Sequence, residues 1–385
     1  MLNTARRRHW QHHLMCRAVA SAMAHLLCVT ALVAQAASNG FVTVTVRDTS
    51  GAPQLNAIVE VFDPARGVPV RRLTDATGVV RLPQPSSGGV RIDVRRLGYR
   101  PESVTLRQGT EHLSIRLRPV PQRLARVEVR DAPSRCQPGF LPYDADSSLR
   151  QVIEALDLYA RQEAALGELY PWIADWSYTG AHYTADGSIV ASDTGRSYRE
   201  DSRRDTLRYA RGRMVERRGL SYIKIRFERV RDLTLPDFLN NHCFAMVEAP
   251  DTAVGRPAVH LRFRADKGVR SADSDGSVFL DPQTLAPLKA IFRWVNLPLG
   301  FADGEEVVRF CEVVPGILMP VHRRFWQSYS KTLFVRDAPV EWSRGVRTMR
   351  DLRWQGDAPA FAPQLSLKSC GVEATDSPPG ARGKP

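Results

Sequence analysis

The chain has 385 residues, of which 43% are hydrophobic and 25% are charged, and this composition excludes a disordered or fibrous protein and allows two ordinary domains. Its formal net charge is +13. The cations are spread along predicted strands instead of forming one run, which predicts solvent-exposed faces, and we expect no nucleic-acid partner.

Residues 1–36 predict a secretory signal peptide. Arg6, Arg7 and Arg8 give it a basic start, an apolar run follows, and Ala34 and Ala36 form an A-x-A cleavage site. An uncleaved membrane anchor is the alternative, but the apolar run is short for a span of about 20 residues. No later apolar run could span a bilayer as a helix. We therefore expect an exported chain in the periplasm, at the outer-membrane periphery or outside the cell.

The pattern of residues 40–130 predicts a small antiparallel β-sandwich. Short runs alternate apolar and polar side chains, the period of half-buried strands. Asp75 and Gly78 bracket a tight turn, because Asp can bond its own backbone and Gly accepts a positive φ. The alternating runs are Phe41–Arg47, Ala57–Phe62, Val90–Arg95, Ser103–Leu106 and His112–Leu117. A further alternating run, Leu124–Arg130, predicts the last strand of this domain.

The order of these pieces resembles the carboxypeptidase regulatory-like domain, a transthyretin-like β-sandwich. The matching residues are Asp48 and Gly51, the Ala57–Val61 strand, Thr74-Asp75-x-x-Gly78, Leu97-Gly98-Tyr99 and Leu117-x-Pro119. The resemblance implies a stabilising, adaptor or ligand-presenting module without peptidase chemistry. Related sandwiches bind carbohydrate, but fold alone does not assign a function.

Residues 131–147 predict a linker, and Ser148–Leu169 predicts the one long helix. Apolar residues of this segment repeat at helical spacing. Ser148 and Gln151 fit a capping box, and Gly167 and Pro171 predict the end of the helix.

Residues 148–356 predict a second, β-rich domain that begins with this helix. Successive strands and hairpins indicate a curved antiparallel sheet packed on the helix. The pattern resembles the half-barrel of lipoprotein-carrier proteins, which implies an apolar cavity between sheet and helix. Residues 357–385 are rich in Pro, Gly and Ala and predict a disordered tail.

Four cysteines remain after residue 36, and an even number in an exported chain predicts disulfides with three possible connectivities. The chain also resembles a group of exported bacterial proteins with a linker Cys, a His-Cys-Phe strand and a Leu-Asp-Pro-x-Thr hairpin, here Cys136, His242-Cys243-Phe244 and Leu280–Thr284. This resemblance implies the pair Cys136–Cys243. A second pair, Cys311–Cys370, would then be optional.

The residues predict no catalytic, metal or cofactor site. His242 and Cys243 would be a nucleophilic pair, but neighbours on a strand point to opposite faces. His182, His260 and His322 lack metal-ligand spacing. The sequence from Asp273 to Gly276 resembles the start of a calcium loop but lacks the Glu that would close it.

Aromatic residues are concentrated after the helix, and they predict either core packing or contacts with a ligand. They are Tyr170, Trp172, Trp176, Tyr178 and Tyr183.

The sequence as a whole predicts a non-catalytic, exported cell-envelope protein with a binding or adaptor role and an unknown partner: an envelope protein, a glycan or a lipid. One alternative is carbohydrate binding by the sandwich. Another is carriage of a lipid or lipoprotein in the half-barrel, which needs an apolar cavity of several hundred cubic ångströms.

Overall fold

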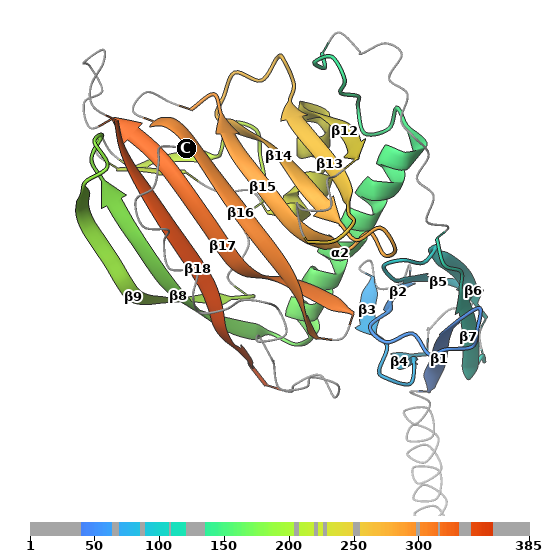
Figure 1. The fold of residues 1–385 in the computed structure, drawn as a ribbon. Helices are drawn as coiled ribbons and strands as arrows, with labels where there is room; N and C mark the ends of the chain where they lie inside the picture. Colours follow the sequence, from blue (N-terminus) through green and yellow to red (C-terminus); the bar gives the residue numbers. More distant parts are fainter. Residues whose placement is uncertain are drawn as a thin grey trace, which may run out of the picture.

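The computed structural model describes residues 40–63, 69–84, 89–107, 109–120, 135–203, 208–218, 222–225, 229–248, 255–297, 301–314, 316–330 and 340–356. These residues form a small β-sandwich beside a larger domain with one long sheet and one long helix (Figure 1). The predicted signal peptide, the strand Leu124–Arg130, Cys370 and the C-terminal tail lie outside the described residues.

The sandwich consists of two sheets whose inward-facing Val, Ile and Leu side chains form a core of their own. One sheet has the strand order β4-β1-β7, and the other has the order β3-β2-β5-β6. The strands are β1 (Phe41–Asp48), β2 (Ile58–Phe62), β3 (Val70–Leu73), β4 (Val79–Pro83), β5 (Val90–Arg95), β6 (Glu102–Leu106) and β7 (His112–Leu117). The prediction of a wholly antiparallel sandwich was wrong at one pair, since β1 and β7 run parallel. These strands lie far apart in the chain, so no short hairpin forces them to be antiparallel.

The turn at Asp75 leads the chain from one sheet of the sandwich to the other. The carboxylate of Asp75 accepts hydrogen bonds from the backbone N–H groups of Thr77 and Val79, each at 2.9 Å, and Gly78 has a φ of 74°. A Cβ on Gly78 would lie 2.4 Å from the carbonyl oxygen of Val46. Both the positive φ and the close contact therefore require glycine.

The long helix, α2 (Ser147–Leu169), starts one residue earlier than predicted. Its N-cap is Asp146, whose side chain accepts hydrogen bonds from the backbone N–H groups of Ser148 and Leu149 at 2.7 and 3.0 Å. The predicted capping box at Ser148 was therefore wrong, because Asp146 is an equally good cap and already binds these N–H groups. Gly167 lies inside the last turn and does not end the helix.

The larger domain is built on a nine-stranded antiparallel sheet that does not close, with strand order β12-β13-β14-β15-β16-β17-β18-β8-β9. Its strands are β8 (Trp172–Tyr183), β9 (Ile189–Asp201), β12 (His242–Glu248), β13 (Val259–Ala265), β14 (Asp273–Leu280), β15 (Pro287–Val295), β16 (Phe301–Val314), β17 (Ile317–Ser330) and β18 (Val340–Trp354). A separate hairpin, β10 (Val215–Arg218) and β11 (Tyr222–Ile225), and two short helices, η1 (Val230–Thr234) and α3 (Pro236–Asn241), complete it. The curved antiparallel sheet packed on one helix is thus confirmed. Strand β9 has no counterpart in the prediction because it is mostly exposed and lacks an apolar alternation.

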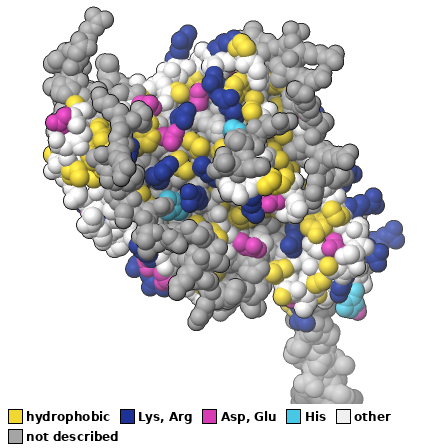
Figure 2. Space-filling model, viewed as in Figure 1, with side chains coloured by type: hydrophobic (Ala, Val, Ile, Leu, Met, Phe, Trp, Pro, Cys, Tyr) yellow, Lys and Arg dark blue, Asp and Glu magenta, His cyan; other side chains and the backbone are white. Residues whose placement is uncertain are grey.

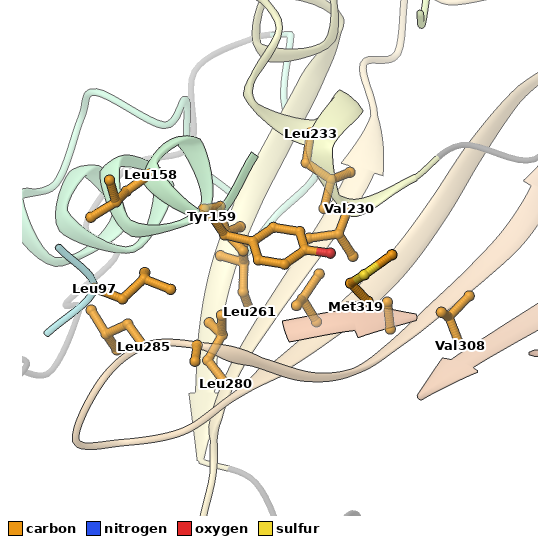
Figure 3. Close-up of a cluster of buried hydrophobic side chains, with 14 of the residues drawn as sticks. Leu97, Leu158, Tyr159, Val230, Leu233, Leu261, Leu280, Leu285, Val308 and Met319 are labelled. Carbon is orange, nitrogen blue, oxygen red and sulfur yellow. The ribbon is translucent and has the colours of Figure 1, made fainter. Parts of the chain in front are cut away.

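One hydrophobic cluster continues from the larger domain into the sandwich. Figure 3 shows Tyr159 and Leu158 of α2 within it, with Leu97 of the sandwich beside Leu285 of the β14–β15 hairpin. Ile58 and Leu73 of the sandwich belong to the same cluster. The two domains therefore share buried apolar surface, which favours a fixed arrangement over independent motion.

Candidate functional site

Two sequence motifs that are almost two hundred residues apart meet where the domains join. Gly98, with a φ of 83°, approaches the β14–β15 hairpin so closely that a Cβ on it would lie 3.5 Å from Thr284 Cα. Leu97 and Leu285 are both 8% exposed at this contact. The Leu97-Gly98-Tyr99 turn is thus one side of the domain contact, and the Asp-Pro hairpin is the other.

Polar contacts support the same arrangement at two other points. The Gln162 side chain of α2 donates a hydrogen bond to the carbonyl oxygen of Asn56 at 3.4 Å, and Arg71 lies 3.9 Å from the Glu168 carboxylate. A Cβ on Gly316, in the β16–β17 turn, would lie 3.7 Å from Asn56 Cβ. The sandwich is therefore held by the helix and by two hairpins of the larger domain.

A cleft of about 910 Å³ opens beside this contact, and both domains line it. Its size falls within the range of small-molecule sites, which often lie between domains. The sandwich contributes Arg95, Leu97–Pro101 and Val120, and the hairpin contributes Pro282–Leu285. One side of α2 contributes Arg150, Gln151, Ile153, Glu154, Ala155, Asp157 and Leu158.

Several polar side chains in the cleft are not bound by other residues of the described ranges. Arg100, Gln151, Glu154 and Gln283 line it, and among the described residues their side chains form no hydrogen bond or ion pair. Asp157, by contrast, is bound by Arg161 at 2.6 Å. Two amides and one charge of each sign thus remain available for a polar ligand. Sequence reasoning missed these residues because they come from three distant segments.

The predicted aromatic residues do not converge on one site. Tyr178 stacks on Phe325, and Tyr183 stacks on Trp342 with ring centroids 3.8 Å apart. Trp176 stacks on Tyr198 at 6.0 Å, and Tyr170 meets Trp354 edge to face. Trp172 is buried. Four of the five rings therefore pack against separate partners. Trp172, Trp176 and Tyr178 are at even spacing on β8 and share one face of the sheet.

The disulfide between Cys136 and Cys243 is present, as the resemblance implied. It joins the segment before α2 to the edge strand β12, where Leu141 and Phe244 also pair through their backbones. Cys311 is half-buried on β16. Because Cys370 lies outside the described residues, the pair Cys311–Cys370 stays a prediction.

His242 lies on the opposite side of β12 from its neighbour Cys243, within a buried polar network. Its Nδ1 lies 2.9 Å from the carbonyl oxygen of Phe238, and its Nε2 lies 3.2 Å from the Asp273 carboxylate. Tyr209 donates a hydrogen bond to the same carboxylate at 2.7 Å. Asp273 is the first residue of the calcium-loop-like sequence, and its buried carboxylate is already bound by His242 and Tyr209. In the described parts of the chain, no three His, Cys, Asp or Glu side chains are grouped so as to hold a metal.

Buried charges lie between α2 and the inner face of the sheet. The Glu306 side chain is 1% exposed, and neither of its oxygens has a hydrogen-bond partner in the described ranges. Burial raises the pKa of Glu306, although nearby Arg323 opposes the shift. The cavity at this point, lined also by Tyr159, measures about 20 Å³, which is enough for about one water molecule. The sequence did not indicate that Glu306 and Arg323 are buried together, because their burial depends on the register of β16 and β17.

Comparisons with known proteins assign the first domain but not the whole chain. Residues 42–118 match the family model of the carboxypeptidase regulatory-like domain. No curated protein matches the chain. Across the described residues, no helix has the length and apolarity needed to cross a bilayer.

Similarities to solved structures are distant. A DUF1329 family protein from Desulfovibrio piger has 13% identity and a TM-score of 0.29, with 55% of this chain and 97% of that chain covered. Fervidolysin from Fervidobacterium pennivorans has 7% identity and a TM-score of 0.18, covering 67% of this chain and 29% of its own. The Bacillus anthracis TIE protein has 9% identity and a TM-score of 0.19, covering 82% and 48%. At these scores the likenesses carry no functional argument. The N-terminal β-sandwich, by its sequence match and its fold, is a carboxypeptidase regulatory-like domain, which is a non-catalytic module.

Proposed function

We propose that this chain is a non-catalytic, exported binding protein of the cell envelope, and that its ligand occupies the cleft between the two domains. The observation that carries the proposal is the cleft of about 910 Å³, whose walls come from both domains and include four polar side chains that no other described residue binds. A pocket of this size with a few available polar groups is the usual form of a ligand site.

The sandwich has a defined part in this proposal. It supplies one wall of the cleft through Tyr99 and Arg100, while α2 and the β14–β15 hairpin supply the other. An adaptor role then means that the module completes a binding site within its own chain. The predicted signal peptide supports a location in the envelope, and the Cys136–Cys243 disulfide is compatible with an oxidising compartment.

Carbohydrate binding is the second candidate, and Tyr99 favours it. This half-buried ring is the aromatic residue that the sandwich brings to the cleft, close to the available amides of Gln151 and Gln283. Lipid carriage inside the half-barrel has less support, because the cavity found between α2 and the sheet near Glu306 is only about 20 Å³.

The test is native mass spectrometry of the exported protein with one substitution that fills the cleft. Ala155 is half-buried on the cleft side of α2, so Ala155→Trp should remove a non-covalent ligand that purifies with the wild-type protein. Ala164 is exposed on the same helix, so Ala164→Trp is the matched control and should retain the ligand. A bare wild-type mass, or a ligand retained by Ala155→Trp, would contradict the proposal.

A further inference from the structure

A second pocket, of about 400 Å³, lies at the C-terminal end of α2, where the chain continues into β8 (Figure 1). Strand β9 runs antiparallel to β8, so the residues that follow β9 return to this end of the helix. Trp172 at the start of β8 and Ser202 and Arg203 after β9 line the pocket, together with the last turns of α2. None of its lining residues lines the cleft between the domains, so the two pockets are separate.

The indole N–H of Trp172 is a buried hydrogen-bond donor at this pocket. Trp172 is 5% exposed, and its Nε1 has no hydrogen-bond partner in the described ranges. A buried donor that stays unsatisfied costs free energy, and a ligand that brings an acceptor recovers this cost. The pocket therefore favours a ligand group that accepts hydrogen bonds.

The glycine at position 167 leaves space beside this N–H group. Gly167 lies within α2 and its φ is not positive, so the backbone conformation does not require glycine there. A Cβ on Gly167 would lie 3.3 Å from Ser202 Cβ and 3.8 Å from both Ser202 Oγ and Trp172 Nε1. The indole N–H and the Ser202 hydroxyl group therefore border the same space, which a larger residue at position 167 would fill.

Ser202 and Arg203 add two further donors. The Oγ of Ser202 accepts a hydrogen bond from the backbone N–H of Trp172 at 3.0 Å, which fixes its position. Its hydroxyl hydrogen has no acceptor among the residues that the structure describes, so it can be donated to a ligand. The exposed guanidinium group of Arg203 likewise binds no other residue of the described ranges. Three donors without an acceptor of their own thus meet in one pocket.

The other charged groups of the pocket have partners or are in water. Arg231 lies 3.5 Å from the Glu163 carboxylate, and Arg208 is also bound. The Glu168 side chain is 63% exposed, so solvent screens its charge. The charge of Arg203 is then the one that a ligand can neutralise. Figure 2 shows Lys and Arg side chains interspersed with hydrophobic and acidic ones, so exposed cations alone do not mark a site, and the buried donors carry the argument.

We propose that this pocket binds the oxyanion group, a phosphate or a carboxylate, of a small ligand. The oxyanion accepts hydrogen bonds from the Trp172 indole, the Ser202 hydroxyl and the Arg203 guanidinium group, and hydrogen bonds to an ionised acceptor are stronger than those between neutral groups. A volume of about 400 Å³ is that of a small-molecule site, so the remainder of the ligand extends along α2 towards Ala164. This proposal does not depend on the ligand of the cleft.

The test follows the indole N–H signals of the protein by NMR while inorganic phosphate or acetate replaces chloride at constant ionic strength. The signal of Trp172, assigned by its loss in Trp172→Phe, should shift and reach saturation. Trp172→Phe should weaken binding of the responding anion on the order of 10-fold in isothermal titration calorimetry, because one hydrogen bond to a charged group is lost. Trp176→Phe is the matched control: it removes another buried indole N–H without a partner in the described ranges, from the same face of β8, and should bind as wild type does.

Two further variants separate this pocket from the cleft. Ala164 lines the pocket, so Ala164→Trp should abolish the shift of the Trp172 signal. Ala155→Trp, which fills the cleft, should leave the shift unchanged. Loss of the cleft ligand and loss of the oxyanion are therefore distinguishable, since each variant removes only one of them.

Three outcomes would overturn the proposal. The Trp172 signal could fail to move with either anion. The signals of Trp172 and Trp176 could move equally, which would mean a general effect of the salt. Trp172→Phe could bind the anion as tightly as wild type. A response to phosphate alone would instead assign the oxyanion to a phosphoryl group, and a response to acetate alone would assign it to a carboxylate. Circular dichroism of each variant separates lost binding from lost folding.

Discussion

At the residue scale, His260 shows how a half-buried ionisable group couples stability to pH. Its ring stacks on Phe279 with centroids 4.4 Å apart, and neither ring nitrogen has a hydrogen-bond partner among the described residues. Burial, and secondarily the charge of Arg262, lowers the pKa of His260 from 6.5 to about 4. The folded protein therefore keeps this ring neutral under conditions in which the unfolded chain protonates it.

The expected result is a loss of stability between pH 6.5 and about pH 4, because protonation there favours the unfolded chain. The contribution of His260 to the free energy of unfolding is fully present above the pKa that the ring has in the unfolded chain. It disappears as the pH falls through the pKa of the ring in the folded protein. Solvent screening of the partly exposed ring limits the effect to about 1–2 kcal/mol. His260→Gln should reduce the difference in unfolding free energy between pH 7 and pH 4 by that amount, measured by urea denaturation. His112→Gln, on an exposed position of β7, should follow the wild-type curve; identical curves for all three proteins would refute the assignment.

At the element scale, the Cys136–Cys243 disulfide fixes the segment that precedes α2 against the edge of the sheet. It closes a loop across a sequence separation of 107. Phe140 packs beside it, with the guanidinium groups of Arg262 and Arg264 at 5.5 and 5.0 Å from its ring. The covered edge strand β12 is therefore protected from pairing with another chain.

Removing this disulfide should destabilise the larger domain, since the unfolded chain gains freedom while the covered edge is released. The expected loss for Cys136→Ser/Cys243→Ser is about 2–5 kcal/mol of unfolding free energy, measured by urea denaturation under oxidising conditions. Treatment of the wild-type protein with a reductant should also lower its unfolding free energy. An unchanged midpoint for the variant would show that the remaining contacts of the segment suffice.

At the scale of the whole molecule, the shared hydrophobic cluster makes the sandwich part of one unit with the larger domain. Leu97 belongs to this shared cluster and not to the sandwich's own core. A change at Leu97 can therefore separate the domains while leaving the sandwich folded.

Leu97→Asp places a charge in this apolar contact and should cost about 2–4 kcal/mol of docking free energy. Differential scanning calorimetry should then show two transitions where the wild type shows one, and the cleft should lose its sandwich wall. Phe62→Asp is the control, because Phe62 is 37% exposed on the sandwich away from the shared cluster. A single transition for Leu97→Asp would mean that the other contacts at Asn56 and Arg71 hold the domains together.

The local elements could be predicted from the sequence, because their signals lie within short segments. The alternation of Phe41–Arg47, the turn from Asp75 to Gly78 and the helical spacing after Ser148 predict a sandwich, a turn and a helix that the structure contains. The pair Cys136–Cys243 came from a resemblance, since spacing alone left three connectivities.

Which of these elements meet could not be predicted and is seen only in the folded chain. The cleft depends on Gly98 lying against Thr284. In the same way, only the strand register brings Lys289 of β15 opposite Arg309 of β16. Periodicity tells which face a side chain occupies along its own strand, but it does not tell which residue of another strand lies beside it. The sites proposed for this protein are built from such neighbours, so they emerge only when the chain is folded.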